Sequence, residues 1–321
     1  MLYYLVTGCA GFIGSHLCEK LLVNGHKVVG LDNFDDFYPR RFKESNIRQL
    51  LGNSNFQLIE GSICSTDDLK RLPDNVDCVI HLAAKTGVRP SIEQADDYFH
   101  TNILGTKKIL DWMVQKGVKK MIFASSSSIY GNNEKVPFSE SDIVDYPISP
   151  YAFTKKACEL MNYNYHHLYG LDIINLRFFT VYGPRQRPDL AIRKFSKMIK
   201  ENRPVTLYGD GSTSRDYTYI EDIISGIIAS CTCLSSNNSI YDIINIGNGS
   251  PTKLADLVEY LYRLNDTIPN IQYLPMQKGD VLKTYADITK AKKKLNYFPT
   301  YSILQGLSQF TKWHEEQMVS T

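Results

Sequence analysis

Three glycines near the amino terminus constrain the fold of this 321-residue chain more than any other feature. Gly8, Gly11 and Gly14 follow an apolar segment, residues 2–7, and lead into a segment with the apolar spacing of a helix, residues 12–23. Glycines in this arrangement permit a tight turn, and they let backbone amides approach a pyrophosphate at the positive end of the helix. The motif therefore predicts a strand-turn-helix unit that binds a dinucleotide.

Apolar runs of strand length alternate with longer amphipathic segments through the first half of the chain. This alternation predicts an α/β fold in which helices cover both faces of a parallel sheet, a Rossmann-type doubly wound architecture. Ligands of such sheets gather at the carboxyl ends of the strands. The predicted strands are residues 2–7, 27–31, 56–60, 78–82, 120–125 and 172–177, with helices at 12–23, 98–115 and 151–168 among the segments between them.

The pattern changes after Arg177, where prolines and glycines interrupt the chain. One further strand is predicted at residues 241–246, and helices are predicted at 191–201, 254–264, 288–295 and 303–314. We therefore expect two units. Residues 1–176 with about 218–248 would form the dinucleotide-binding domain, and about 177–217 with 249–321 a smaller α/β substrate-binding lobe built from discontinuous segments.

A carboxylate after the second predicted strand favours one dinucleotide. Asp32 lies 18 residues after Gly14, where it can accept hydrogen bonds from both ribose hydroxyls and would repel a 2′-phosphate, so NAD is expected rather than NADP. The alternative is a structural glycine turn with an exposed aspartate. Cofactor contacts are expected from the glycine turn and from residues after the next three strands, namely Gly8, Gly11, Phe12, Ile13, Gly14, Asp32, Asn33, Ser62, Ile63, Leu82, Ala83 and Ala84.

Tyr151 and Lys155 lie four residues apart in the predicted helix 151–168, and therefore on one face of it. A phenol with its usual pKa near 10 is a poor base at neutral pH. An ammonium group and a positively charged nicotinamide ring nearby would stabilise the phenolate and lower that pKa, so both residues are also expected to contact the cofactor. Serines 125–128 follow the fifth strand and bring hydroxyls to the same edge. Such a Tyr and Lys pair also occurs by chance on helix surfaces, but this combination predicts hydride transfer to and from a nicotinamide.

Over nearly its whole length the chain resembles the nucleotide-sugar epimerases of the extended short-chain dehydrogenase/reductase family. The strings Thr86-Gly87-Val88-Arg89 and RFFTVYGPRQRPD at residues 177–189 resemble UDP-glucuronate 4-epimerases in particular. The resemblance implies an isomerase with tightly bound NAD. It would convert UDP-glucuronate to UDP-galacturonate through a transient 4-keto sugar.

The resemblance also assigns residues by their position in these motifs. It implies a catalytic triad of Ser126, Tyr151 and Lys155, with Arg185 on the sugar carboxylate and Arg215 on the diphosphate. Ser127 and Ser128 stand where dehydratases and decarboxylases of this fold carry acids, which argues against both reactions. The full set of implied substrate contacts is Arg89, Ser127, Ser128, Thr180, Arg185, Arg187, Arg215 and Asp280.

Two other functions remain open at this point. One is a UDP-glucose or UDP-N-acetylhexosamine 4-epimerase, which would use the same machinery on an uncharged sugar. The other is an NAD-sensing protein that has lost the chemistry. The intact Ser126, Tyr151 and Lys155 argue against a sensor, because a sensor has no need of a poised phenol.

Composition and charge limit the classes of binding partner that we expect. The net charge is +2, from 36 basic and 34 acidic residues spread through the chain, which gives no electrostatic basis for binding nucleic acid. Seven cysteines at irregular spacings are typical of reduced thiols, and no metal-binding spacing occurs among them. No basic leader and no apolar stretch of membrane-spanning length is found, so a cytoplasmic protein without a membrane partner is expected. In the family that the chain resembles, helices 98–115 and 151–168 would pair two subunits, which implies a homodimer.

Overall fold

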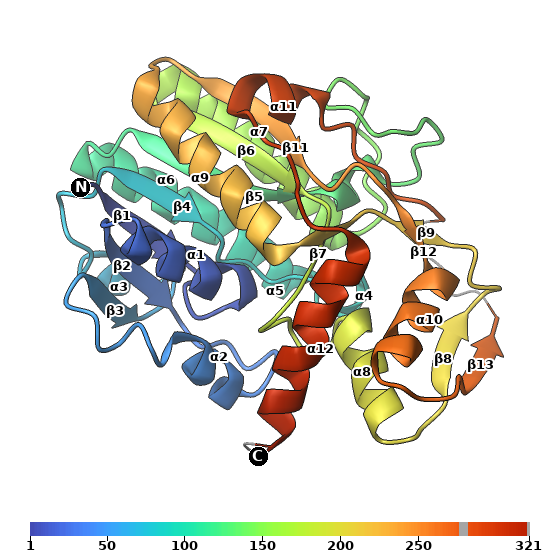
Figure 1. The fold of residues 1–321 in the computed structure, drawn as a ribbon. Helices are drawn as coiled ribbons and strands as arrows, with labels where there is room; N and C mark the ends of the chain where they lie inside the picture. The colour runs from blue at the N-terminus through green and yellow to red at the C-terminus, as the bar shows by residue number, and fades with distance from the viewer. Residues whose placement is uncertain (276–281, 320–321) are drawn as a thin grey trace.

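The computed structural model describes residues 1–275 and 282–319. Seven strands form a central sheet in the order β11-β6-β5-β4-β1-β2-β3 (Figure 1). All neighbouring strands in it are parallel. The seven strands predicted from the sequence are confirmed to within one residue at each end: β1 (Tyr3–Thr7), β2 (Lys27–Asp32), β3 (Phe56–Glu60), β4 (Cys78–His81), β5 (Lys120–Ser126), β6 (Asp172–Phe178) and β11 (Tyr241–Ile246).

Helices cover both faces of this sheet and bury a core on each. Successive residues of a strand point to opposite faces. Tyr4 and Val6 of β1 accordingly pack in the cluster that contains Leu17 of α1 (Phe12–Val23) and the apolar residues of α9 (Ile220–Ser236). Leu5 packs in the other cluster, with Ile109 of α6 (Gly105–Lys116) and apolar residues of α7 (Pro150–Tyr169). The arrangement confirms the predicted doubly wound Rossmann-type fold.

The elements after β6 that leave the sheet gather beside it at the right of Figure 1. They include a parallel pair, β8 (Val205–Tyr208) with β13 (Ile271–Leu274), and an antiparallel pair, β9 (Ser214–Arg215) with β12 (Thr252–Lys253). Helix α11 (Thr289–Leu295) instead packs on α9 and β11 of the main sheet. The remaining elements of this region are β7 (Thr180–Tyr182), β10 (Tyr217–Tyr219), α8 (Ala191–Lys200), α10 (Leu254–Leu264) and α12 (Ile303–Val319).

The start of α7 is fixed by local chemistry. The Ser149 hydroxyl accepts a hydrogen bond from the Ala152 amide at 3.1 Å, and Pro150 occupies the first turn. Tyr151 is thereby held in the first turn of the helix.

The predicted helix 98–115 is not continuous, because a π-helical segment, η1 (Phe99–Leu104), separates α5 (Ala95–Tyr98) from α6. The other short elements are α2 (Arg40–Ile47), α3 (Thr66–Leu69), α4 (Val88–Glu93) and the 3₁₀ turn η2 (Ser127–Tyr130).

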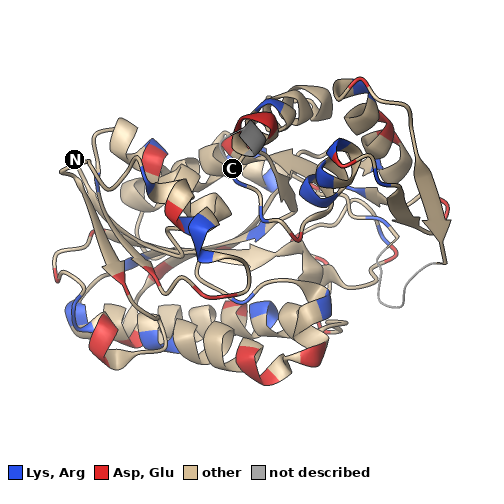
Figure 2. Ribbon diagram, turned by 90° about the horizontal axis from the view of Figure 1, so that it is seen from below, with Lys and Arg blue, Asp and Glu red and all other residues tan. Residues whose placement is uncertain are grey.

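Neither a membrane-spanning helix nor a cluster of metal ligands occurs among the described residues, 1–275 and 282–319. No helix in these ranges is long and apolar enough to cross a membrane. Within the same ranges, no group of three or more His, Cys, Asp or Glu side chains could hold a metal ion. Figure 2 shows acidic and basic residues interspersed along the helices rather than gathered by sign.

Candidate active site

A cavity of about 410 Å³ lies where the carboxyl ends of β1 to β6 meet. Strand order reverses between β1 and β4, and a crevice at such a reversal is where open α/β sheets bind ligands. Most of the residues singled out in the sequence line it: Gly8, Gly11, Phe12, Ile13, Gly14, Asp32, Asn33, Ser62, Ile63, Leu82, Ala83, Ala84, Ser126, Ser128, Tyr151, Lys155, Thr180 and Arg187.

The glycine turn at one end of the cavity leaves no room for side chains. A Cβ on Gly14 would lie 2.1 Å from the Gly8 carbonyl oxygen, and one on Gly8 would lie 2.9 Å from the Ala83 amide nitrogen. No side chain caps the N-terminus of α1 at Gly11, so the first amides of that helix face the turn without an internal acceptor. The turn therefore fits the pyrophosphate of a dinucleotide, which such amides bind.

Asp32 organises the neighbouring ribose end. Its Oδ2 accepts from the Ala10 amide at 2.9 Å and its Oδ1 from the Phe34 amide at 2.8 Å. Burial raises the pKa of Asp32, while the charge of Lys43 and these two amides oppose that rise. Each carboxylate oxygen has a second lone pair. Asp32 can thus fix the glycine turn and still accept a ribose hydroxyl, as NAD would require.

Ser126, Tyr151 and Lys155 converge at the other end of the cavity. The Lys155 Nζ donates to the Ala124 carbonyl at 2.7 Å, and burial lowers the pKa of Lys155 to about 8. Burial raises the pKa of Tyr151, and the opposing influences are a hydrogen bond with the Ser126 side chain and the charge of Arg187. Ser126 is therefore a close neighbour of Tyr151 in the cavity. The lowering of the Tyr151 pKa by Lys155 and a bound nicotinamide stays a prediction.

The two arginines of the 177–189 string face different ways. Arg187 lines the cavity, where it contacts Thr86 and its Nη2 pairs with Asp189 at 2.8 Å. Arg185 is not among the cavity-lining residues, and its Nη2 pairs with Glu19 of α1 at 2.9 Å. The backbone of Arg185 has φ +63°, in the left-handed region, which accompanies the turn of its side chain toward α1. The structure thus places Arg187, rather than Arg185, beside the reacting groups.

Several other expected substrate contacts are not among the residues that line the cavity. Arg89 places its guanidinium 5.7 Å from the centre of the Tyr208 ring, and the Arg215 Nη1 donates to the Ser214 carbonyl at 3.0 Å. Ser127 is not a lining residue either, and Asp280 lies outside the described residues.

Sequence reasoning also missed residues that do line the cavity. Lys85 and Asp35 form an ion pair at 3.1 Å between the segments after β4 and β2. Lys43 reaches the ribose end from α2, a helix that was not predicted. The one available signal was the position of Lys85 directly after Ala84, at a strand end already assigned to the ligand.

The fold and the site define an α/β protein of the Rossmann class with a dinucleotide cleft and a Ser, Tyr and Lys group at its edge. The resemblance stated from the motifs is confirmed by comparison with known proteins. The chain belongs to the family described as GDP-mannose 4,6 dehydratase, whose profile matches residues 5–310.

Individual relatives carry epimerase names. A UDP-glucuronate 4-epimerase of Thermodesulfobacterium geofontis is 46% identical over 319 residues, which are 98% of this chain and 97% of that protein. The crystal structure of UDP-glucuronic acid 4-epimerase from Bacillus cereus with UDP-glucuronic acid and NAD matches with a TM-score of 0.92 and 39% identity, covering 98% of this chain and 100% of that one. A UDP-glucose 4-epimerase from Thermotoga maritima matches with a TM-score of 0.90 and 33% identity, covering 99% and 100%.

Proposed function

We propose that this chain is an NAD-dependent isomerase that interconverts UDP-glucuronate and UDP-galacturonate. The observation that carries the proposal is the Ser126, Tyr151 and Lys155 group at the end of the dinucleotide cleft. The 46% identity to a UDP-glucuronate 4-epimerase supports the choice of substrate. NAD, when bound along the glycine turn, supplies the place to which a hydride from carbon 4 can move and from which it can return.

The protein residues handle the proton. Tyr151 would take the proton from the sugar 4-hydroxyl, while the Ser126 hydroxyl, which lines the same cavity, would steady the same oxygen. Lys155, with a pKa of about 8, is mainly an ammonium at neutral pH and adds positive charge to the site. The proton and the hydride both return to the sugar, the hydride on the opposite face of a 4-keto intermediate. The reaction involves no net oxidation, so tightly bound NAD can serve repeated turnovers.

Arg187 is our candidate for the sugar carboxylate, in place of Arg185. It lines the cavity together with Ser128 and Thr180, whereas Arg185 is paired on α1. A guanidinium that holds a carboxylate by two hydrogen bonds fixes its angle as well as its position. In the 4-keto intermediate the carboxylate is β to a ketone, and a fixed angle would hinder loss of carbon dioxide. Roles for Arg89, Ser127, Arg215 and Asp280 in binding the substrate remain predictions.

The dehydratase named in the family description needs an acid beside the catalytic hydroxyl. In this chain the two residues after Ser126 are serines. A serine hydroxyl cannot donate its proton near neutral pH as a carboxylic acid can. We therefore propose epimerisation without loss of water.

The first test is conversion without added cofactor. Purified protein is mixed with UDP-glucuronate alone, and NMR should show the signals of UDP-galacturonate growing to an equilibrium. Conversion of UDP-glucose but not of UDP-glucuronate would favour the uncharged-sugar alternative. Bound NAD with no conversion of either sugar would favour an NAD sensor.

Two variants test the assigned roles. Tyr151→Phe should lower turnover by about 10²- to 10⁴-fold while NAD content is unchanged. Arg187→Met should impair UDP-glucuronate more than UDP-glucose, with Arg185→Met as the matched control that leaves this preference intact. A larger loss of preference in Arg185→Met would overturn the choice between the two arginines.

We also propose a homodimer formed through α7. Its outward face carries the exposed apolar side chains of Phe153, Leu160 and Leu168, at positions opposite the buried Lys155. Exposed apolar side chains grouped on one helix face are typical of an interaction surface. Light scattering after gel filtration should give twice the chain mass, and Leu160→Glu should shift the protein toward one chain. A monomeric parent protein would contradict the proposal.

The division of labour between the two parts of the chain is a proposal as well. Residues 1–176 with about 218–248 would bind NAD, and about 177–217 with 249–321 would hold the nucleotide sugar. The glycine turn and Asp32, which lie in the first part, support this division. The packing of α11 on α9 and β11 shows that one element of the second part also braces the main sheet.

A cytoplasmic location is proposed on the state of the thiols. All seven cysteines are free, and five of them are buried in the core. Reduced thiols persist in the cytoplasm and are rare in oxidising compartments. Cell fractionation followed by immunoblotting would test the location.

A further inference from the structure

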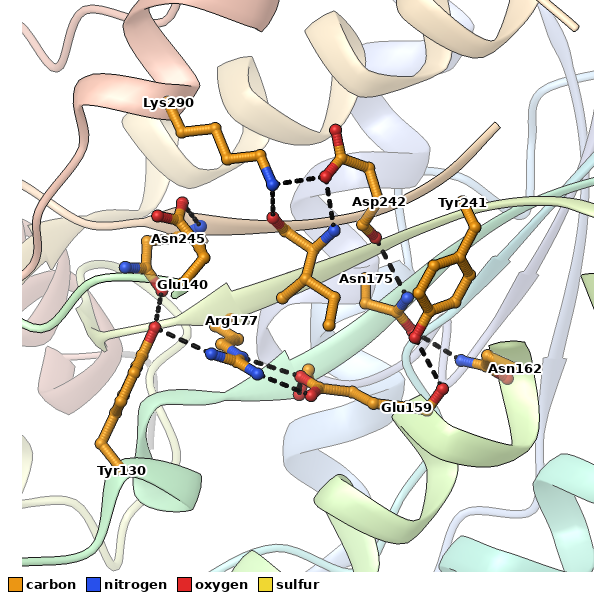
Figure 3. Close-up of polar contacts among 12 residues, drawn as sticks. Tyr130, Glu140, Glu159, Asn162, Asn175, Arg177, Tyr241, Asp242, Asn245 and Lys290 are labelled. Atoms are coloured by element: carbon orange, nitrogen blue, oxygen red, sulfur yellow. Dashed lines mark hydrogen bonds and ion pairs between the residues drawn. The ribbon is translucent and has the colours of Figure 1, made fainter. Parts of the chain in front are cut away.

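A buried ion pair lies behind the candidate catalytic residues. The Arg177 Nε donates to the Glu159 Oε1 at 2.9 Å, and its Nη2 donates to Oε2 at 2.8 Å (Figure 3). Only 1% of each side chain is exposed. Taking two charges out of water costs about as much free energy as their attraction returns, so such a pair is weak evidence for stability. Its place in the fold therefore calls for another explanation.

The Glu159 carboxylate joins three elements of the site. Glu159 lies one helical turn beyond Lys155 and two turns beyond Tyr151, on the same face of α7. Its Oε1 also accepts from the Ser125 hydroxyl of β5 at 2.6 Å. Ser125 lies between Ala124, whose carbonyl accepts from Lys155, and Ser126, and it pairs with Arg177 across β5 and β6. One carboxylate thus links the helix of the phenol to the strand end of the catalytic serine.

The guanidinium extends the same network to the far side of the serine turn. The Arg177 Nη1 donates to the Tyr130 hydroxyl at 3.0 Å, at the end of η2. That hydroxyl donates to the Asn245 Oδ1 of β11 at 2.7 Å. The Asn245 amide in turn donates to the carbonyls of Phe138 at 2.9 Å and Asp287 at 3.2 Å. The turn that starts after Ser126 is therefore held at both ends, as Figure 3 lets the reader follow from Glu159 to Asn245.

We propose that Glu159 is a positioning residue for this active site. Its carboxylate sets the spacing between Tyr151 and Lys155 on α7 and Ser126 on β5, and it balances the charge of Arg177 next to Lys155. The inference rests on the proposed function only for the reaction that this spacing of side chains promotes. The contacts themselves are independent of which sugar reacts.

Charge near Lys155 gives the proposal a second consequence. The groups that face its ammonium are Cys158 and Glu159 on α7 and His81 on β4, with Arg177 of β6 behind Glu159. Burial lowers the pKa of Lys155, and the Cys158 and Glu159 groups oppose that fall. Without the carboxylate, the Arg177 charge would stand unbalanced beside Lys155. The ammonium would then lose its proton at a lower pH.

The variant Glu159→Gln, studied in the NAD-loaded protein, tests the position and charge of the Glu159 side chain without removing the side chain from the folded core. Glutamine keeps the length of the side chain and an oxygen for Ser125, and it removes the charge. We expect unchanged NAD content and a KM for UDP-glucuronate within about twofold of the parent. We expect kcat to fall about tenfold to a hundredfold, because small misplacements of reacting groups have effects of this size. The alkaline limb of the kcat profile should move to lower pH.

Asp222→Asn is the matched control, since it alters a buried carboxylate bonded to Thr300 and Tyr301 away from the cavity, and its pH profile should be unchanged.

A double variant covers the case in which Glu159→Gln does not fold. Glu159→Leu with Arg177→Met removes both charges, and apolar replacement of a buried pair is often neutral or stabilising. A folded double variant with parent kcat would overturn the proposal, and a folded one with low kcat supports it.

A further readout needs no substrate, so it remains available if UDP-glucuronate proves to be the wrong sugar. The ultraviolet absorbance of tyrosinate is titrated in each background with and without Tyr151→Phe, which isolates the ionisation of Tyr151. In Glu159→Gln this ionisation should move to lower pH, because the Arg177 charge is no longer balanced and favours the tyrosinate. An unmoved ionisation would overturn the proposal.

Discussion

Lys155 is expected to destabilise the fold that it serves. Burial lowers its pKa from the usual 10.5 to about 8. At 1.36 kcal/mol for each pH unit between those values, holding the ammonium in the folded chain at neutral pH costs about 3 kcal/mol. Lys155→Met keeps most of the side-chain volume and removes this cost. It also leaves the Ala124 carbonyl without its donor, a loss of about 1 kcal/mol. The variant should therefore be about 2 kcal/mol more stable than the parent at pH 7, and inactive.

The stability difference between the parent and Lys155→Met should depend on pH. An unfolded chain keeps the Lys155 proton up to its ordinary pKa of 10.5, whereas the folded chain loses it near pH 8. Between these values the unfolded state binds more protons, so the free energy of unfolding of the parent rises with pH through that window. Lys155→Met lacks this rise. Its advantage should be largest below about pH 8 and should disappear by about pH 10.

Urea unfolding followed by circular dichroism measures both quantities. The parent and Lys155→Met are compared at equal NAD occupancy, because a bound nucleotide stabilises the folded state by mass action. Lys107→Met is the control, since Lys107 is exposed and pairs with Asp111, and its effect should stay below about 1 kcal/mol. If Lys155→Met were less stable than the parent at pH 7, or if its stability rose with pH as steeply as that of the parent, the reasoning from burial would be refuted.

Three further changes test single features. Ser149→Ala removes the cap of α7 and should lower the free energy of unfolding by about 1 kcal/mol in urea, and no loss would mean that the hydroxyl does not cap the helix. Gly14→Ala would place a Cβ 2.1 Å from the Gly8 carbonyl oxygen, so the protein should be isolated with little NAD, measured as nucleotide released on denaturation; parent-level NAD would contradict the fit of the turn. Tyr130→Phe leaves the Asn245 Oδ1 without its donor and should cost about 1 to 3 kcal/mol, whereas a neutral result would show that water replaces it.

Most strands were predictable because they are apolar runs buried on both faces between helices. Helix α9 was not predicted, for a related reason. It presents buried residues on more than one side, among them Ile220 and Asp222, and it carries β-branched and small residues rather than a clear polar face. Such a segment lacks the period of an amphipathic helix. The break at η1 escaped prediction as well, because a π-helical turn changes the hydrogen bonds without changing the apolar spacing.

Within the site, residues in local motifs were placed well, and residues that depend on distant partners were not. Tyr151 and Lys155 share a helix, and the glycine turn is contiguous, so spacing alone brings each set together. Lys85 and Asp35 follow different strands, and their ion pair exists only because β1 lies between β4 and β2 in the sheet. No pattern within either segment encodes that neighbourhood.

The two arginines show what decides between adjacent candidates. Both belong to one loop, and both carry the charge that a carboxylate would need. The left-handed backbone at Arg185 and its partner Glu19 on α1 direct one guanidinium to the helix of the glycine turn. The His16 ring bonds the Pro184 carbonyl at 3.0 Å and holds the same loop against α1. With the loop held there, Arg187 two residues later projects into the cavity. A side chain outside the cavity can in this way determine which neighbour enters it.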